Sequence, residues 1–136
     1  MAVQLIDTSV LIDVQRGALP LEPLVTEGKV ISVISVSELL HGVHRADNAS
    51  RRLRREAVVE QILGAVEQVP IDSEVARVHA SVWAGLQDSG EIIQAHDLWI
   101  AATALTHGLQ LVTTNVRHFE RVPGLSLLAM RSSQSS

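Results

Sequence analysis

Short apolar runs alternate with stripes of apolar residues at helical spacing, and this alternation constrains the fold more than any other feature. The runs are rich in β-branched residues and show no regular polar alternation, which favours strands that are buried on both faces. We expect four strands, and a fifth short one at the sheet edge, at residues 3–7, 30–34, 69–71, 109–114 and 125–128.

Between these runs, apolar residues recur three and four positions apart, which predicts amphipathic helices. The stripes cover residues 36–43, 58–66, 75–86 and 96–107, and Gly108 is expected to end the last helix as its C-cap. Strands that alternate with helices predict the α/β class, with a parallel sheet covered by helices on both sides.

The size of the chain and its lack of cysteine narrow its class further. With 136 residues, of which 46% are hydrophobic, the chain is expected to form one domain over residues 1–130, followed by a polar, disordered tail at 131–136. The absence of cysteine excludes disulfide scaffolds, thiolate zinc sites, iron–sulfur clusters and a cysteine nucleophile. No apolar run approaches the roughly 18 residues of a membrane span, and the first residues do not resemble a signal peptide. We therefore expect a cytoplasmic protein.

Three acidic residues lie where such a fold could gather them. Asp7 directly follows the first apolar run, Glu38 lies in the helix after the second, and Asp97 lies in the first turn of the helix before the fourth. Each also has a purely structural interpretation. Asp7 could cap a turn, Glu38 could form a capping box with Ser35, and Asp97 could interact favourably with the helix dipole.

Ligands bind at the carboxyl ends of the strands in open parallel sheets, so three acids that open toward this edge would form an anionic cluster. Such a cluster needs a cation to stay fully ionised. Oxygen ligands without cysteine indicate a hard divalent ion such as Mg²⁺ or Mn²⁺, which can activate water and stabilise charge on a phosphate. Neither a phosphate-binding glycine loop nor a GxSxG serine motif is present.

Four segments of the sequence resemble the PIN-domain ribonucleases, and specifically the VapC toxins of bacterial type II toxin–antitoxin pairs. They are LIDTSVLID at residues 5–13, SVSELLHGV at 35–43, AHDLWIAATALTHGLQLVTTN at 95–115 and VRHF at 116–119. The resemblance extends from about residue 3 to residue 128, and it implies a PIN-like α/β/α sandwich with four or five parallel strands.

The resemblance also implies an activity and the residues that perform it. It assigns Asp7, Glu38 and Asp97 as the catalytic and metal-binding acids of a Mg²⁺- or Mn²⁺-dependent endoribonuclease that cuts a transfer or ribosomal RNA. Ser9 and Thr113 fall on supporting hydroxyl positions. A homodimer is implied, as is a VapB-type antitoxin that forms a hetero-oligomer with the toxin and neutralises it.

The sequence departs from the family pattern at two positions. The fourth acidic position holds Asn115, which adds no charge, so the number of metal ions stays open between one and two. His118 stands where the family commonly has an acid. These departures keep a second interpretation open, a catalytically weak PIN-like module that binds RNA or protein. A DxD phosphatase is disfavoured because Ser9 replaces the second aspartate.

An arginine-rich stretch is the remaining candidate site. The net charge of the chain is −4, which argues against non-specific coating of nucleic acid. Yet Arg45 and the run Arg51–Arg55 give residues 45–56 a net charge of +3. The stretch could hold RNA phosphates or an acidic antitoxin segment. It could equally be a solvated helix face, because arginines at four of five consecutive positions point around the helix.

Overall fold

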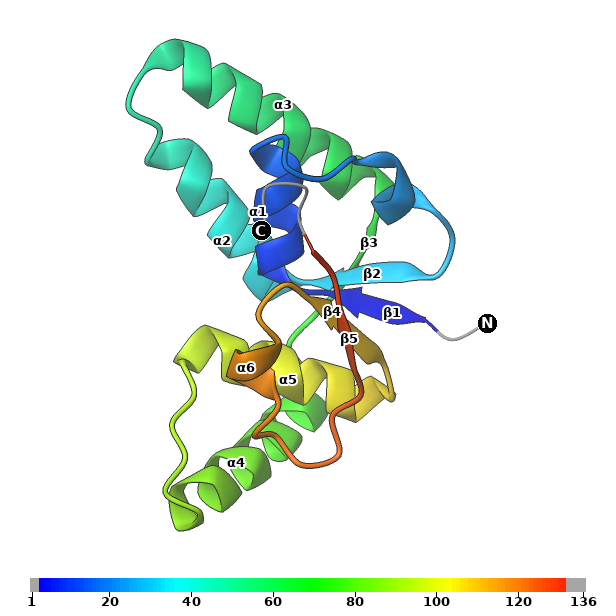
Figure 1. Ribbon diagram of the computed structural model, residues 1–136, viewed down its shortest axis with the longest axis vertical. Helices are drawn as coiled ribbons and strands as arrows, with labels where there is room; N and C mark the ends of the chain where they lie inside the picture. The colour runs from blue at the N-terminus through cyan, green and yellow to red at the C-terminus, as the bar shows by residue number, and fades with distance from the viewer. Residues whose placement is uncertain (1–2, 132–136) are drawn as a thin grey trace.

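Helices and strands alternate along the chain in the computed structural model, which describes residues 3–131 (Figure 1). The strands are β1 (Gln4–Ile6), β2 (Lys29–Ser32), β3 (Glu67–Val69), β4 (Gln110–Thr113) and β5 (Leu127–Ala129). The helices are α1 (Thr8–Gln15), α2 (Val33–His44), α3 (Ala49–Ala65), α4 (Ser73–Asp88), α5 (Ala95–His107) and α6 (Val116–Phe119), with a short 3-10 turn η1 (Glu22–Val25).

The five strands form one parallel sheet in the order β3-β2-β1-β4-β5. From the central strand β1 the chain first builds outward to β2 and β3, and later returns to add β4 and β5 on the other side. The strand order therefore reverses between β1 and β4, and in open parallel sheets ligands bind outside the carboxyl ends of the strands at such a point. The predicted α/β class and five parallel strands are confirmed.

The sheet separates two apolar layers, as Figure 1 shows, with α1, α2 and α3 on one side and α4, α5 and α6 on the other. Neighbouring residues of one strand face opposite layers, because side chains alternate along a strand. Ile6 belongs to the cluster formed with α1, α2 and α3, whereas Leu5 belongs to the cluster formed with α5 and α6. Both are almost fully buried, which confirms the prediction of strands covered on both faces.

The strand β2 ends earlier than the apolar run predicts, because α2 begins at Val33. The side chain of Ser32 caps this helix by accepting a hydrogen bond from the Ile34 amide at 3.0 Å. The proposed capping box of Ser35 with Glu38 is therefore wrong. Ser35 lies within α2, where it is fully buried, and Glu38 is free to serve another purpose.

The two edge strands are also displaced from their predicted positions. The strand β3 covers Glu67–Val69 instead of 69–71, and β5 covers Leu127–Ala129 instead of 125–128. Their limits are set by pairing with β2 and β4, for example Ser32 with Val69, and not by their own apolar residues. Gly108 ends α5 as predicted, with a left-handed φ of 64°.

The predicted tail at 131–136 lies, apart from its first residue, outside the described residues. Within residues 3–131, no helix has both the length and the hydropathy needed to cross a membrane.

Candidate functional site

Asp7 lies at the carboxyl end of β1, beside the point where the strand order reverses. Its backbone amide donates to the carbonyl oxygen of Val112 on β4 at 2.9 Å, which fixes the residue between the two strands. The side chain is 3% exposed and does not cap α1, so the turn-capping interpretation of this acid is wrong. Instead, Oδ2 accepts hydrogen bonds from the hydroxyls of Ser9 at 2.7 Å and Thr113 at 2.8 Å.

The two hydroxyls that hold Asp7 are themselves held by the loop after β4. The amide of Thr114 donates to Ser9 Oγ at 3.1 Å, and the amide of Asn115 donates to Thr113 Oγ1 at 2.9 Å. Each hydroxyl therefore accepts from the backbone while it donates to the carboxylate. The structure brings both predicted supporting residues to Asp7. Asn115 lies at the start of α6 in the same loop, with an exposed side chain that does not cap the helix.

Glu38 lies on α2 and reaches the same region through a contact that the sequence did not predict. Its Oε1 accepts a hydrogen bond from Thr8 Oγ1 at 2.9 Å, and that hydroxyl is also 2.7 Å from Ser35 Oγ. On its other side, Oε2 lies 3.6 Å from Nδ1 of His96, an ion pair when the imidazole is protonated. Thr8, together with Ser35, therefore fixes the position of one carboxylate oxygen of Glu38, and His96 on α5 lies beside the other.

Asp97 lies in the first turn of α5, and its electrostatics show that the three acids form one cluster. Burial raises the pKa of its carboxyl, and the charge of Asp7 raises this pKa further, with a smaller contribution from Glu38. A hydrogen bond and the nearby charge of His118 act in the opposite direction, with Nδ1 of His118 3.2 Å from Asp97 Oδ2. Three segments that are far apart in the sequence thus bring their carboxylates within electrostatic reach of each other.

The donor chemistry of this cluster fits a hard divalent cation. All three side chains offer oxygen, and their mutual repulsion is the kind that a cation relieves. Among residues 3–131, the hydrogen bonds to Asp7 and Asp97 go to one oxygen of each, Oδ2, which leaves Oδ1 of each outside this network. In the described part of the chain, however, no three His, Cys, Asp or Glu side chains are arranged to hold a metal ion together.

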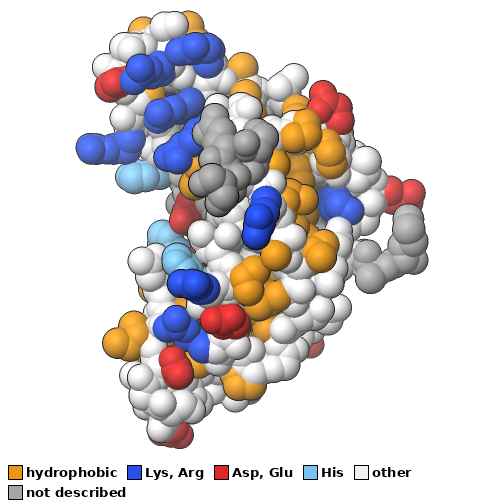
Figure 2. Space-filling view, viewed as in Figure 1, with side chains coloured by type: hydrophobic (Ala, Val, Ile, Leu, Met, Phe, Trp, Pro, Cys, Tyr) orange, Lys and Arg blue, Asp and Glu red, His pale blue; other side chains and the backbone are white. Residues whose placement is uncertain are grey.

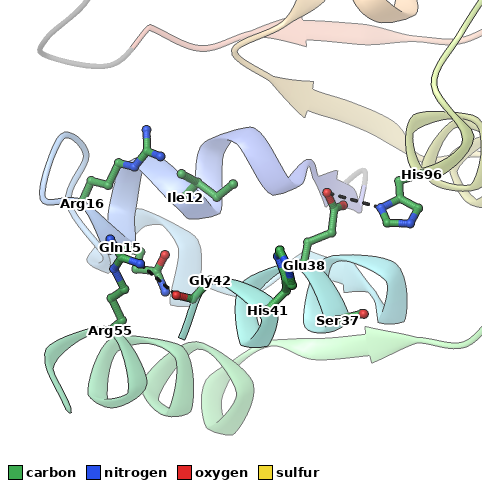
Figure 3. A pocket seen from close by; sticks show the side chains of 9 residues that line it. All are labelled: Ile12, Gln15, Arg16, Ser37, Glu38, His41, Gly42, Arg55 and His96. Carbon is green, nitrogen blue, oxygen red and sulfur yellow. Dashed lines mark hydrogen bonds and ion pairs between the residues drawn. The ribbon is translucent and has the colours of Figure 1, made fainter. Parts of the chain in front are cut away.

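The surface around the cluster is hollowed on both sides. Figure 2 shows a notch between the part of the molecule built by α2 and α3 and the part built by α5 and α6, with acidic side chains in the notch and histidines beside it. A hollow of about 230 Å³ adjoins Asp97 and His118. A larger groove of about 500 Å³ begins at Glu38 and His96 and extends along α1 and α2 (Figure 3).

Sequence reasoning missed two residues of this site. Thr8 was visible only as one of several polar residues after the first strand, and its role depends on how α1 packs against α2. The sequence marks His118 only as a departure from the family pattern, and in the structure it contacts Asp97. No local pattern could have assigned His118, because 21 positions separate it from its partner.

The fold and the site define an α/β protein whose acidic residues cluster where the strand order of a parallel sheet reverses. Residues 5–125 match the PIN domain. Ribonuclease VapC1 of Rickettsia felis is 36% identical over 129 residues, which cover 94% of this chain and 96% of that protein. The tRNA(fMet)-specific endonuclease VapC of Salmonella typhimurium is 34% identical over 75% of each chain.

Solved structures agree with these relatives. VapBC bound to DNA from Salmonella typhimurium superposes with a TM-score of 0.85 at 28% identity, over 95% of this chain and 98% of that one. VapBC-5 of Mycobacterium tuberculosis gives a TM-score of 0.77 at 31% identity, over 96% and 99%. The chain belongs to the PIN-domain family and, within it, to the VapC ribonucleases. The resemblance seen in the sequence motifs is confirmed, and with it the assignment as a nuclease.

Nucleases of this family generally depend on a divalent metal. The acidic cluster at the carboxyl ends of the strands is the place in the described structure whose chemistry suits one.

Proposed function

We propose that this protein is the toxin of a type II toxin–antitoxin pair and cleaves RNA phosphodiester bonds with the help of Mg²⁺, for which Mn²⁺ can substitute. The observation that carries the proposal is the placement of the buried Asp7 at the carboxyl end of β1, where the strand order reverses, with Asp97 close enough to interact electrostatically with both Asp7 and Glu38. Repulsion between carboxylates destabilises a fold, and clusters of this kind are common at functional sites. We further propose that residues 1–130 act as one domain, in the cytoplasm, where the RNA is.

The proposed roles of the acids follow from their placement. Asp7 and Asp97 would hold the metal directly, and Glu38 would do so directly or through water. A bound divalent ion supplies an activated water and stabilises the charge that develops on the phosphate. Ser9 and Thr113 keep Asp7 in one orientation, and Thr8 does the same for Glu38, so that few side chains must be ordered when substrate binds.

The substrate we propose is a specific transfer or ribosomal RNA. The Salmonella relative is named as specific for tRNA(fMet), and transfer RNA is therefore the first candidate. Only three side chains of the chain, 2%, are aromatic, which disfavours recognition by stacking of several bases and favours recognition of backbone shape.

The proposed partner is a VapB-type antitoxin, because the structural neighbours are toxins solved with such a partner. An antitoxin arginine that reaches Asp7, Glu38 and Asp97 would relieve the same repulsion as a metal ion and block its site. We also propose a homodimer within the hetero-oligomer. Trp83, which is 52% exposed on α4, is the apolar side chain we expect at a contact between copies.

Cleavage of total cellular RNA by the purified protein tests the activity. Discrete fragments are expected with Mg²⁺ or Mn²⁺ and not with EDTA, and the Asp97→Asn variant should produce none. The fragment ends then identify the substrate. Metal-independent fragments, or fragments that persist with Asp97→Asn, would contradict the proposal. A protein that does not bind metal and does not cleave RNA would instead support the interpretation as a binding module. The uncharged Asn115 at the fourth acidic position favours that interpretation.

A further inference from the structure

The groove that begins at Glu38 leads to positively charged surface. Glu38 and His96 lie at one end of this groove, and Gln15, Arg16 and Arg55 lie at the other (Figure 3). The floor between them is formed by α1 and α2. A ligand that occupies the acidic end and continues along the groove therefore meets arginines.

A second hollow of about 280 Å³ continues the groove. It shares three lining residues with the first part and adds two arginines from α3, so that its lining is Gln15, Arg16, Arg51, Arg54 and Arg55. We call this second part the arginine hollow. Figure 2 shows basic side chains gathered over the same part of the molecule, on one side of the notch.

The spacing of the arginines on α3 explains why three of them line one hollow. Positions 51, 54 and 55 share a helix face, since residues three and four apart are neighbours on a helix. Arg52 points away from this face and does not line the hollow. As expected, the four arginines of the run do not all face the same ligand site, but Arg52 is the one that does not line the hollow. Arg16, at the end of α1, completes the group from another helix.

Most of the positive charge in the arginine hollow has no acidic partner among residues 3–131. Arg51 pairs with Asp47 at 2.8 Å, and Arg55 donates from Nη1 to the carbonyl oxygen of Gly42 at 2.8 Å. Within residues 3–131, the side chains of Arg16 and Arg54 make no hydrogen bond or ion pair. One carboxylate therefore neutralises one of the four guanidinium groups, and the positive charge that remains favours binding of an anion.

A neutral donor adds a second, independent indication of a ligand. Nε2 of Gln15 is buried and has no hydrogen-bond partner within the described structure. Gln15 lines both parts of the groove, at the point where they meet. Buried amide donors are nearly always paired, and a ligand toward which this side chain turns would supply the missing acceptor.

We propose that the arginine hollow binds backbone phosphates of the RNA strand beside the cleavage site, while the scissile phosphate lies at Asp7, Glu38 and Asp97. This inference rests on the proposed nuclease function. Guanidinium groups bind phosphate oxygens in a bidentate manner, and such contacts position a strand without reading its sequence. An acidic peptide fits this groove less well, because its carboxylates would be repelled by Glu38. An RNA strand must bring its scissile phosphate to Glu38 for cleavage, so this proximity is part of the proposed function.

Salt-dependent binding of a fluorescent oligouridylate, followed by anisotropy, tests this subsite. All variants carry Asp97→Asn so that the probe stays intact. Each phosphate contact to a single strand contributes about 0.7 to the slope of log K against log salt. We expect Arg16→Ala with Arg54→Ala to lower that slope by about 1.4. Arg52→Ala, the matched control on the same helix, should leave the slope unchanged, and lysine at positions 16 and 54 should restore it.

The outcomes separate this inference from the function on which it rests. A slope that is unchanged in the double variant, or equally lowered by Arg52→Ala, overturns the subsite. So does a double variant that loses affinity for oligoglutamate but keeps its affinity for RNA, since the hollow would then bind an acidic peptide. A lowered slope, together with a protein that cuts no RNA even when Asp97 is present, leaves the subsite standing and rejects the nuclease. Circular dichroism confirms that each variant is folded.

Discussion

Thr113→Val should destabilise the fold by removing a hydroxyl that serves both Asp7 and the loop after β4. The hydroxyl is fully buried, donates to Asp7 Oδ2 at 2.8 Å and accepts from the Asn115 amide at 2.9 Å. A hydrogen bond to a carboxylate contributes about 1.5–3 kcal/mol and the backbone bond about 1 kcal/mol. The added methyl group recovers about 0.8 kcal/mol by its burial. We therefore expect a net loss of about 2–3 kcal/mol in the free energy of unfolding.

Urea denaturation in EDTA measures this loss without interference from a bound metal. The midpoint should fall while the slope of free energy against urea stays constant. Thr103→Val is the matched control: its hydroxyl is as fully buried, but it donates only to the carbonyl oxygen of Trp99 within α5, at 2.8 Å. This control should lose less than about 0.5 kcal/mol. Equal losses in the two variants would show that the contact with Asp7 contributes nothing special, and would refute the reasoning.

Three further predictions concern the charge, metal and backbone of the same region. Burial and the charge of Asp7 raise the pKa of Asp97. The folded protein therefore loses stability as the pH rises from the pKa of this carboxyl in the unfolded state, about 4, through its raised pKa in the folded state. Asp97→Asn should unfold at a higher urea concentration than wild type at about pH 7, with the difference gone at about pH 3, and a variant less stable than wild type at neutral pH would contradict this. Mg²⁺ should raise the melting temperature of the wild type by mass action and not that of Asp7→Asn, and an equal rise in both would place the metal elsewhere. Gly108→Ala should cost about 1 kcal/mol by chemical denaturation, because φ is 64° there although nothing lies within 4 Å of the added carbon; a gain in stability would show that the backbone relaxes.

Much of the fold could be predicted from the sequence because the central strands carry their own signal. The runs around β1 and β4 are apolar on both faces and end in polar residues, so their limits are nearly as predicted. The run at 30–34 predicts a strand that ends too late, because its apolar residues continue into α2. The boundary is revealed only by the hydrogen bond with which Ser32 caps that helix. Edge strands such as Glu67–Val69 take their position from their neighbours, which no local pattern contains.

The acids of the site could be predicted individually, but not the contacts that hold them. The end of the first strand places Asp7 at the ligand-binding edge once the sheet is assumed to be parallel, whereas the edge at which the helix of Asp97 starts depends on the topology. The partners of these acids come from distant segments, as Thr113 and His118 show, with separations of 106 and 21 positions. Such pairs depend on how the layers pack together, and single-sequence patterns do not encode that packing.

The placement of β1 between β2 and β4 has a consequence for a newly synthesised chain. Asp7 and Glu38 are made early, but Gln4 on β1 pairs with Gln110, and Asp97 follows Glu38 only after 59 more residues. At a rate of roughly 5–20 residues per second, a ribosome needs about 3–12 s to add them. Throughout that interval the nascent chain has no complete acidic cluster. Toxicity is therefore delayed until Asp97 and β4 have been synthesised, and a neutralising partner is needed only from that moment.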